Sequence, residues 1–293
     1  MNNRTNLKLL FVINSASGNK KLDYQEEIKK HLEAQAHNAS YFMMPLQCRA
    51  DLIKSEIDTY KPDVVIACGG DGTVKLVAES LLETKMPLGI IAAGSANGLA
   101  KELGIPLAVP EALDLILAGN TMPVSMIKIN GELCIHLADI GFNAFVIKKF
   151  EAGKGRGMWG YIKASWQVLM KHPKMNAKIL VNNKMITRDA SMIVIANATR
   201  YGSGATINPL GRLDDDVFEL VVVKKISVSE LFKMMVSHGS FDPGKTELLQ
   251  TSSLEIHSKR HVHFQVDGEY LGKTNKVEAS IIPAAITVIV PGK

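Results

Sequence analysis

Hydrophobic and polar positions follow a repeating pattern over the first 120 residues. Short apolar runs, typical of buried strands, are each followed by a longer stretch with apolar residues at helical spacing. The expected strands are Lys8–Ile13, Tyr41–Met44, Val64–Cys68 and Leu88–Ala92, and the expected helices are Leu22–Gln35, Ala50–Tyr60, Val74–Glu83, Asn97–Leu103 and Pro110–Leu117. This alternation predicts an α/β domain built on a doubly wound parallel sheet.

The pattern changes at about residue 124, where apolar segments become short, β-branched and separated by turn signals. The expected strands here are Ala177–Val181, Met192–Ala196, Val217–Val223, His261–Val266 and Ala285–Val290, and the expected helices are Met158–Met170 and Val228–Val236. We therefore predict two domains, an α/β domain at residues 1–123 and a mainly antiparallel β domain at residues 124–293.

Composition narrows the class of protein. With 46% hydrophobic residues in 293, the chain can bury large cores, which excludes disorder. The three cysteines lack metal-ligand spacing and indicate a reducing compartment. Neither a signal peptide nor a run of roughly 18 apolar residues is present, so we expect a cytoplasmic protein. The net charge of +5 is concentrated at residues 148–163 without a recognised nucleic-acid module, so we expect no nucleic-acid partner.

Three small, polar loops follow three of the expected strands. They read Asn-Ser-Ala-Ser-Gly-Asn-Lys at 14–20, Gly-Gly-Asp-Gly-Thr at 69–73 and Ala-Gly-Ser-Ala-Asn-Gly at 93–98. Each alone is compatible with ordinary helix capping. Because the carboxyl ends of parallel strands meet at one sheet edge, and helix N-termini hold anions, the three together predict a nucleotide-phosphate site. Neither a Walker A motif nor Gly-x-Gly-x-x-Gly occurs.

The order of these motifs resembles the diacylglycerol kinase catalytic family, which includes bacterial lipid kinases and sphingosine kinases. An Asp-Gly-Glu motif at residues 267–269 extends the resemblance over nearly the whole chain. Gly-Gly-Asp-Gly-Thr alone is shared with NAD kinases. The resemblance implies an NAD kinase-like fold and a lipid kinase that uses ATP and Mg²⁺. Its substrate would be a diacylglycerol-like or sphingoid-like lipid with a free hydroxyl.

The resemblance also implies roles for individual residues. Asp71 would orient the lipid hydroxyl and take up its proton, and Glu269 would complete the site through metal-bound water or as an alternative base. Asp139 resembles a position that contacts the lipid head group, and Asp215, in an acidic run, resembles a structural Mg²⁺ ligand. The residues that would bind ATP are Asn14, Ser17, Gly18, Gly70, Gly72, Thr73, Gly94, Ser95, Asn97 and Arg156.

Two positions depart from the family pattern. Many bacterial members carry acids that help to hold Mg²⁺ where this chain has Gly98 and Ser125. Two alternatives therefore stay open. One is a kinase for a soluble metabolite such as NAD, and the other is a non-catalytic regulator that binds lipid or nucleotide.

Two further segments allow more than one interpretation. Trp159 and Trp166 follow helical spacing beside a basic cluster, which suits either peripheral membrane contact or packing on the β domain. His261 and His263 alternate along an expected strand beside Lys259, which favours a solvent-facing strand over a metal site. The sequence does not indicate an oligomeric state.

Overall fold

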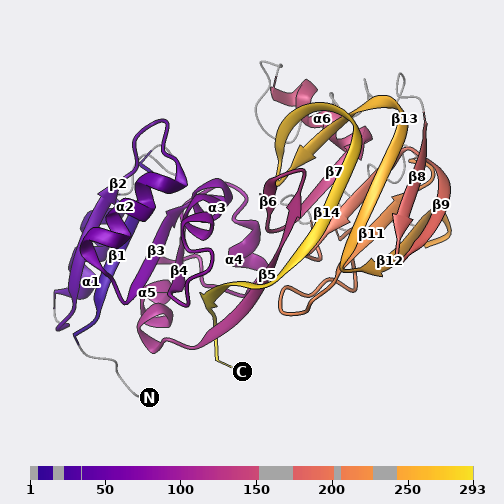
Figure 1. Cartoon of the computed structure of the whole chain (residues 1–293). Coiled ribbons are helices and arrows are strands. Elements are labelled where there is room, and N and C mark those ends of the chain that lie inside the picture. Colours follow the sequence, from indigo (N-terminus) through magenta and orange to yellow (C-terminus); the bar gives the residue numbers. More distant parts are fainter. Residues whose placement is uncertain are drawn as a thin grey trace. The chain divides into compact units, whose positions relative to one another are not determined.

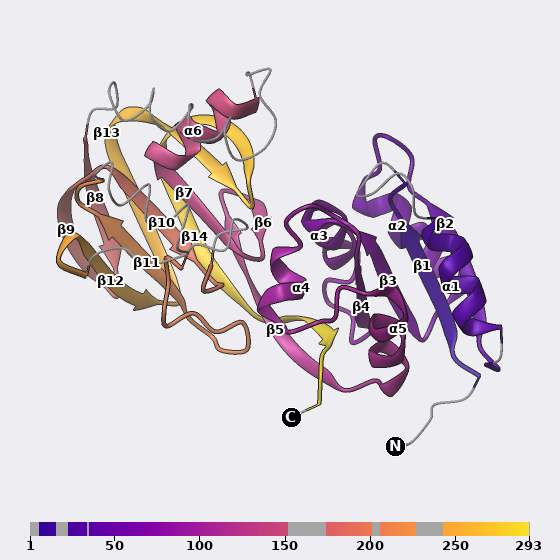
Figure 2. The same ribbon diagram turned by 180° about the vertical axis from the view of Figure 1, so that it is seen from behind.

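The computed structural model describes residues 6–15, 23–33, 35–151, 174–200, 206–226 and 243–292. The chain divides into two compact units (Figure 1; Figure 2 from behind). One, the α/β unit, comprises Met1–Ser125 and Ala284–Lys293, and the other, the β unit, comprises Met126–Pro283.

The α/β unit contains a parallel sheet with strand order β2-β1-β3-β4-β14. Its strands are β1 (Lys8–Ile13), β2 (Asn38–Met43), β3 (Val64–Gly69), β4 (Pro87–Ala92) and the last residues of β14 (Glu269–Ile289). Every residue of β3 is buried, as expected of a central strand that is covered on both faces.

Five helices accompany this sheet: α1 (Tyr24–Leu32), α2 (Ala50–Tyr60), α3 (Asp71–Ser80), α4 (Gly98–Glu102) and α5 (Val109–Ala118). Helix α1 packs against α5, and α2 packs against α3. Phe11 and Ile66 of the sheet share a buried cluster with Ile28 of α1 and Leu113 of α5. The predicted doubly wound α/β architecture is confirmed, although α3 begins at Asp71 and not at Val74.

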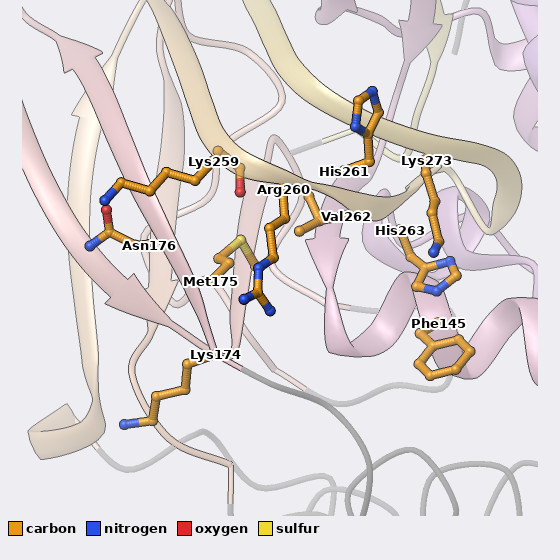
Figure 3. Close-up of a pocket in the computed structure, with 11 residues that line it drawn as sticks. Phe145, Lys174, Met175, Asn176, Lys259, Arg260, His261, Val262, His263 and Lys273 are labelled. Atoms are coloured by element: carbon orange, nitrogen blue, oxygen red, sulfur yellow. The ribbon is translucent and has the colours of Figure 1, made fainter.

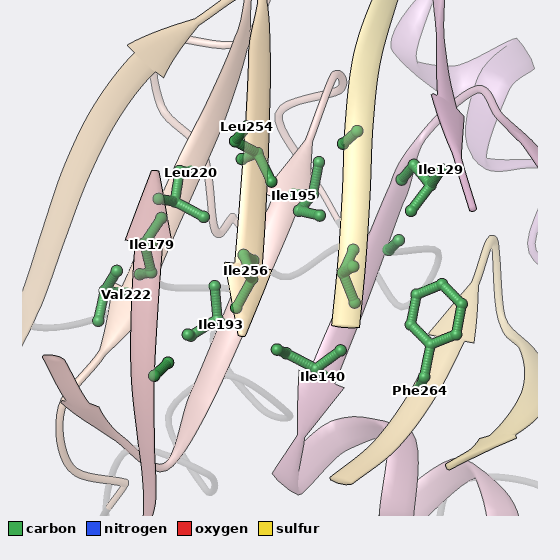
Figure 4. Close-up of a cluster of buried hydrophobic side chains, with 14 of the residues drawn as sticks. Ile129, Ile140, Ile179, Ile193, Ile195, Leu220, Val222, Leu254, Ile256 and Phe264 are labelled. Atoms are coloured by element: carbon green, nitrogen blue, oxygen red, sulfur yellow. The ribbon is translucent and has the colours of Figure 1, made fainter. Parts of the chain in front are cut away.

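The β unit is mainly antiparallel, as predicted, with strand order β12-β11-β10-β7-β13-β14 and a β8–β9 hairpin paired to β13. Its elements are β5 (Thr121–Ile129), β6 (Glu132–Cys134), β7 (Leu137–Gly141), α6 (Phe142–Glu151), β8 (Met175–Val181), β9 (Lys184–Ala190), β10 (Met192–Ala196), β11 (Phe218–Val223), the 3₁₀ helix Pro243–Lys245, β12 (Thr246–Thr251), β13 (Ser253–Val266) and β14. Figure 4 shows the main core, in which isoleucine, leucine and valine side chains from these strands interdigitate.

The return of the chain to the α/β unit differs from the expected division at residue 124. Residues 284–293 were expected in the β domain. In the structure, Thr287 and Val288 pair in parallel with the beginning of β4, and Val290 N–H donates to the Asn120 carbonyl at 2.9 Å. A long strand of uniform pattern does not reveal where along its length it changes partners.

Two expected helices, at 158–170 and 228–236, lie outside the described residues. Helix α6 was not expected. Among the helices that are described, none combines the length and apolar character needed to cross a bilayer.

Candidate functional site

The loops after β1, β3 and β4 meet at one edge of the parallel sheet. The strand ends are in register, with Ile13 opposite Cys68 and Cys68 opposite Ile91. The loops are tied at their bases, because Asn14 N–H donates to the Cys68 carbonyl at 3.0 Å and Ala93 N–H donates to the Gly69 carbonyl at 2.9 Å. The structure therefore brings together Asn14 and the second and third motifs, and residues 16–20 of the first motif lie outside the described residues.

The second and third loops touch backbone to backbone. A Cβ atom on Gly94 would lie 2.5 Å from the Gly70 Cα atom, and one on Gly70 would lie 3.3 Å from the Gly94 Cα atom. A side chain at Gly94 is thus excluded by backbone that cannot easily move. Gly72 differs, because a Cβ atom there would meet nothing within 4 Å. The glycine turn therefore contacts the third loop at Gly70 and has open space beside Gly72.

Asp71 is the first residue of α3, directly after the N-cap Gly70. Its Oδ1 atom accepts a hydrogen bond from the Leu99 backbone N–H of α4 at 3.1 Å, so the third loop holds the carboxylate in place. Gly70, as a glycine, supplies no side chain to cap the N-terminus of α3. A carboxylate and a turn of backbone N–H groups consequently lie side by side, and the helix dipole favours negative charge there.

The three loops are braced by side-chain hydrogen bonds. Asn14 Nδ2 donates to Thr73 Oγ1 at 3.0 Å, which links the first loop to the second. Asn97, in the left-handed conformation with φ of 50°, accepts from Gly94 N–H at 2.8 Å and donates to the Gly94 carbonyl at 2.9 Å. The observed role of Asn97 is thus to close its own loop, and it does not cap α4. Ser95, between them, is exposed.

The positions that depart from the family pattern also have defined places. Gly98 begins α4. Ser125 is buried, and its Oγ atom accepts a hydrogen bond from Ala284 N–H at 3.1 Å, where the chain returns to the α/β unit. Ser125 therefore has a structural partner. Ser17, Gly18 and Arg156, which were expected to bind ATP, lie outside the described residues, as do both tryptophans.

The Asp-Gly-Glu motif forms the hairpin turn between β13 and β14. Asp267 and Gly268 both have positive φ, of 49° and 88°, as in a type I′ turn. The Asp267 carboxylate accepts backbone N–H groups of the β6–β7 connection, from Ile135 at 3.0 Å, His136 at 2.9 Å and Leu137 at 3.3 Å. Glu269 follows on β14 and is exposed. The turn therefore fixes Asp267 inward and leaves Glu269 at the surface of the β unit.

Asp139 lies inside the β unit, where it is 1% exposed. Its carboxylate accepts hydrogen bonds from Asn143 Nδ2 at 2.6 Å, Gln265 Nε2 at 2.6 Å and Ala144 N–H at 2.8 Å. Burial raises the pKa of this carboxyl to about 6, against the opposing effect of the three donors. Gln265 in turn accepts Gly268 N–H at 2.7 Å.

A hydrogen-bonded chain thus runs from the N-terminus of α6 through Asp139 and Gln265 to the turn that carries Glu269. The sequence analysis missed the contributions of Asn143 and Gln265, because amide side chains on unconnected elements carry no sequence signal. Contact between Asp139 and a lipid head group, which the resemblance implies, stays a prediction and would require the buried carboxylate to become accessible.

The acidic run at residues 214–216 is engaged in local contacts. Asp214 forms an ion pair with Arg212, with hydrogen bonds of 3.1 and 3.2 Å, and Asp215 accepts Val217 N–H at 3.4 Å. Within the described ranges, no group of three His, Cys, Asp or Glu side chains is arranged to hold a metal ion. The assignment of Asp215 as a Mg²⁺ ligand stays a prediction.

The expectation of a solvent-facing strand is wrong for His263. His261 is exposed, but His263 is only 8% exposed. Its ring stacks on Phe145 of α6 with centroids 4.2 Å apart, and its Nδ1 atom lies 2.8 Å from the Tyr270 hydroxyl. The packing of α6, a helix that the sequence analysis did not predict, buries one face of β13.

The chain combines a parallel sheet that has glycine-rich loops at one edge with an antiparallel β unit. Comparison with known proteins shows that this combination belongs here to a family of kinases. Residues 8–129 match the family model of the diacylglycerol kinase catalytic domain, and residues 138–290 match that of the YegS C-terminal NAD kinase beta sandwich-like domain. The chain therefore belongs to the diacylglycerol kinase catalytic family, as the resemblance indicated, and at family level it is a lipid kinase.

Individual relatives agree with this assignment. "Probable lipid kinase YegS" from Escherichia fergusonii is 30% identical over 238 residues, covering 78% of each chain. An uncharacterized protein from Synechocystis sp. is 32% identical over 237 residues, covering 78% of this chain but only 54% of that protein. A crystal structure of a "putative diacylglycerol kinase" from Bacillus anthracis str. Sterne has the same fold, with a TM-score of 0.78, 23% identity and coverage of 98% and 99% of the two chains.

Proposed function

We propose that this lipid kinase transfers the γ-phosphate of ATP to a hydroxyl of a diacylglycerol-like or sphingoid-like lipid. The observation that carries the proposal is the position of Asp71 at the N-terminus of α3, with its carboxylate held by the loop that also contacts Gly70. An acid in this position lies next to backbone N–H groups that suit phosphate oxygens.

The geometry of the loops fits a nucleotide phosphate chain. Gly70 and Gly94 lie in direct contact, which holds the second and third loops together, and the open space beside Gly72 lets an anion approach the backbone closely. The N-cap residue of α3 is Gly70, which has no side chain to cap the first turn, so the N–H groups of this turn are suited to an external acceptor. Asn14 and Thr73 hold two of the loops at a fixed separation.

Asp71 would act on the lipid hydroxyl. As the lipid oxygen bonds to the γ-phosphorus, the bond from that phosphorus to the bridging oxygen breaks and ADP leaves. The hydroxyl proton passes to the Asp71 carboxylate. Phosphoryl transfer depends chiefly on positioning and electrostatic stabilisation, so a single well-held acid is sufficient for this role.

Asp71 is also the residue that we propose to help hold Mg²⁺. A magnesium ion is usually bound by one or two protein carboxylates together with substrate phosphates, which agrees with a site built from one acid and phosphate-type loops. When bound, Mg²⁺ would supply neutralisation of the phosphate charge.

The test uses purified protein, γ-labelled ATP, Mg²⁺ and a total lipid extract, with Asp71→Asn in parallel. Asp58→Asn is a matched control, because Asp58 is an exposed acid on α2 outside the loops. We expect labelled lipid from the wild type and the control, and a rate lower by about 10²–10⁴-fold in Asp71→Asn, the range of general-base catalysis. Glu269→Gln in the same assay tests the predicted role of Glu269.

Other outcomes would point to the alternatives. Labelling of NAD in the absence of lipid would favour a soluble-metabolite kinase. ATP-dependent stabilisation without labelling of any acceptor would favour a regulator. Full activity of Asp71→Asn on lipid would refute the role given to this carboxylate.

A further inference from the structure

A cavity of about 520 Å³ lies in the β unit, on the side where α6 packs against β13 (Figure 3). It is lined by Phe145 of α6, residues 174–176 at the start of β8, residues 258–263 of β13 and Lys273 of β14. Nothing in the reaction proposed above uses this cavity.

An irregularity in β13 builds one wall of the cavity. The β13–β14 ladder pairs His257 with Lys276, and it resumes with Val262 opposite Thr274. Residues 258–261 of β13 therefore lie opposite a single residue of β14, and these extra residues of β13 include Lys259 and Arg260. Such bulges redirect side chains and are common next to functional sites.

Among the described residues, the lining of the cavity includes cations and no acidic residue. Its charged members are Lys174, Lys259, Arg260 and Lys273. In the part of the chain that the structure describes, none of these four makes an ion pair or a side-chain hydrogen bond. Like charges gathered without a counter-charge repel one another, which favours binding of an anion.

Two cations elsewhere in the β unit are paired with acids. Arg188 forms a bidentate ion pair with Glu247 at 2.7 Å, and Lys276 contacts Glu255 at 3.1 Å. The cavity differs from these positions because four cations line one space and, among the described residues, have no such acid beside them.

The interior of the cavity is apolar and ordered by packing. Phe145 stacks on the buried His263 ring, and Met175 and Val262 contribute further apolar lining. In Figure 3, Lys273 extends toward His263, and Arg260 extends past Met175. His263 and Lys273 are direct partners in the ladder. The cavity is therefore lined by charged side chains at its edge and by aromatic and aliphatic side chains at its bottom.

We propose that this cavity binds a phosphate ester, and that the cations hold the phosphate while the apolar floor contacts the carbon atoms attached to it. Arginine and lysine are the side chains best suited to phosphate oxygens. The shared chemistry is found in the head group of an anionic phospholipid and in a soluble sugar-type phosphate. Because the protein is a lipid kinase at family level, we expect the lipid head group.

The proposal is tested by binding measurements without ATP, so that failure of the kinase reaction would not affect the result. Sedimentation with vesicles of phosphatidylcholine alone is compared with vesicles that also contain phosphatidate, and calorimetry with glycerol 3-phosphate supplies the soluble arm. The test variant is Arg260→Ala/Lys273→Ala. The control, Lys178→Ala/Lys184→Ala, removes the same charge from exposed positions outside the cavity.

We expect binding to phosphatidate vesicles to weaken about 30-fold in the test variant, as two cations contributing about fivefold each would give, and to change less than about twofold in the control. The same pattern with glycerol 3-phosphate, but no vesicle binding, would support the cavity with a soluble ligand. Equal losses in both variants, no loss in either, or no binding of either phosphate ester by the wild type would overturn the proposal. Matching melting temperatures establish that both variants are folded.

Discussion

Replacing Asp139 with asparagine should change how the stability of the β unit depends on pH. The carboxyl is 1% exposed, and burial raises its pKa from 3.8 to about 6. Asparagine has nearly the same size and cannot ionise. The wild type carries a titrating group at this position and the variant does not.

The size and sign of the effect follow from the two pKa values. At about 1.4 kcal/mol per pKa unit, the difference between the unfolded and folded values corresponds to about 3 kcal/mol. Because the folded state binds the proton more tightly, the contribution of Asp139 to stability is complete below about pH 4. It is lost as the pH rises through the folded pKa near 6.

Urea unfolding of both proteins at a series of pH values between 4 and 7.5 measures this contribution. Far-ultraviolet circular dichroism follows the loss of the strands of the β unit. We expect the free energy of unfolding of the wild type, relative to Asp139→Asn, to fall by about 2.5 kcal/mol across this range. All other carboxyls titrate in both proteins, so their contributions cancel in the difference between the two free energies of unfolding.

A relative stability that does not change with pH would refute this reasoning. It would mean that the hydrogen bonds from Asn143, Gln265 and Ala144 offset the cost of burying the charge. A change of opposite sign would mean that they exceed it.

Further predictions concern the loops, the hairpin turn and the thiols. Gly94→Ala forces a side chain against backbone and should lower the free energy of unfolding by about 1–3 kcal/mol and reduce stabilisation by ATP in a thermal-shift assay, whereas Gly72→Ala should leave the free energy of unfolding nearly unchanged. Asp267→Ala deprives three backbone N–H groups of their acceptor and should lower the free energy of urea unfolding by about 3 kcal/mol. Of the three thiols, the partly exposed Cys48 should react with a thiol reagent in the folded protein, and the other two, which are buried, should react only after unfolding.

The α/β unit could be predicted from sequence because each of its strands and loops is indicated by residues that are adjacent in the sequence. A short apolar run such as Val64–Cys68 is typical of a buried parallel strand, and parallel topology alone brings the following loops to one edge. The positions of Asn14, Asp71 and Gly94 follow from that rule. The start of α3 at Asp71 was less evident, since glycines seldom indicate a helix.

The β unit was predicted less completely because its structure depends on contacts between residues that are far apart in the sequence. Helix α6 begins beside Asp139, whose partner Gln265 is 126 residues away. The Asp-Gly pair at 267–268 signals a hairpin, but nothing in the sequence shows that the Asp267 carboxylate binds three N–H groups of another connection. Such contacts arise only when the strand order is known.

The path of β14 has a consequence for biosynthesis. Residues 284–289 complete the parallel sheet beside β4, yet a ribosome reaches them only after making the intervening segment of about 160 residues, which at usual rates of translation takes roughly 8–30 s. During that interval the nascent α/β unit has an unpaired edge at β4, a surface open to pairing with other chains. A fragment that stops at residue 125 would keep this edge permanently, so a useful minimal version of the α/β unit should carry residues 284–290 on a linker after Ser125.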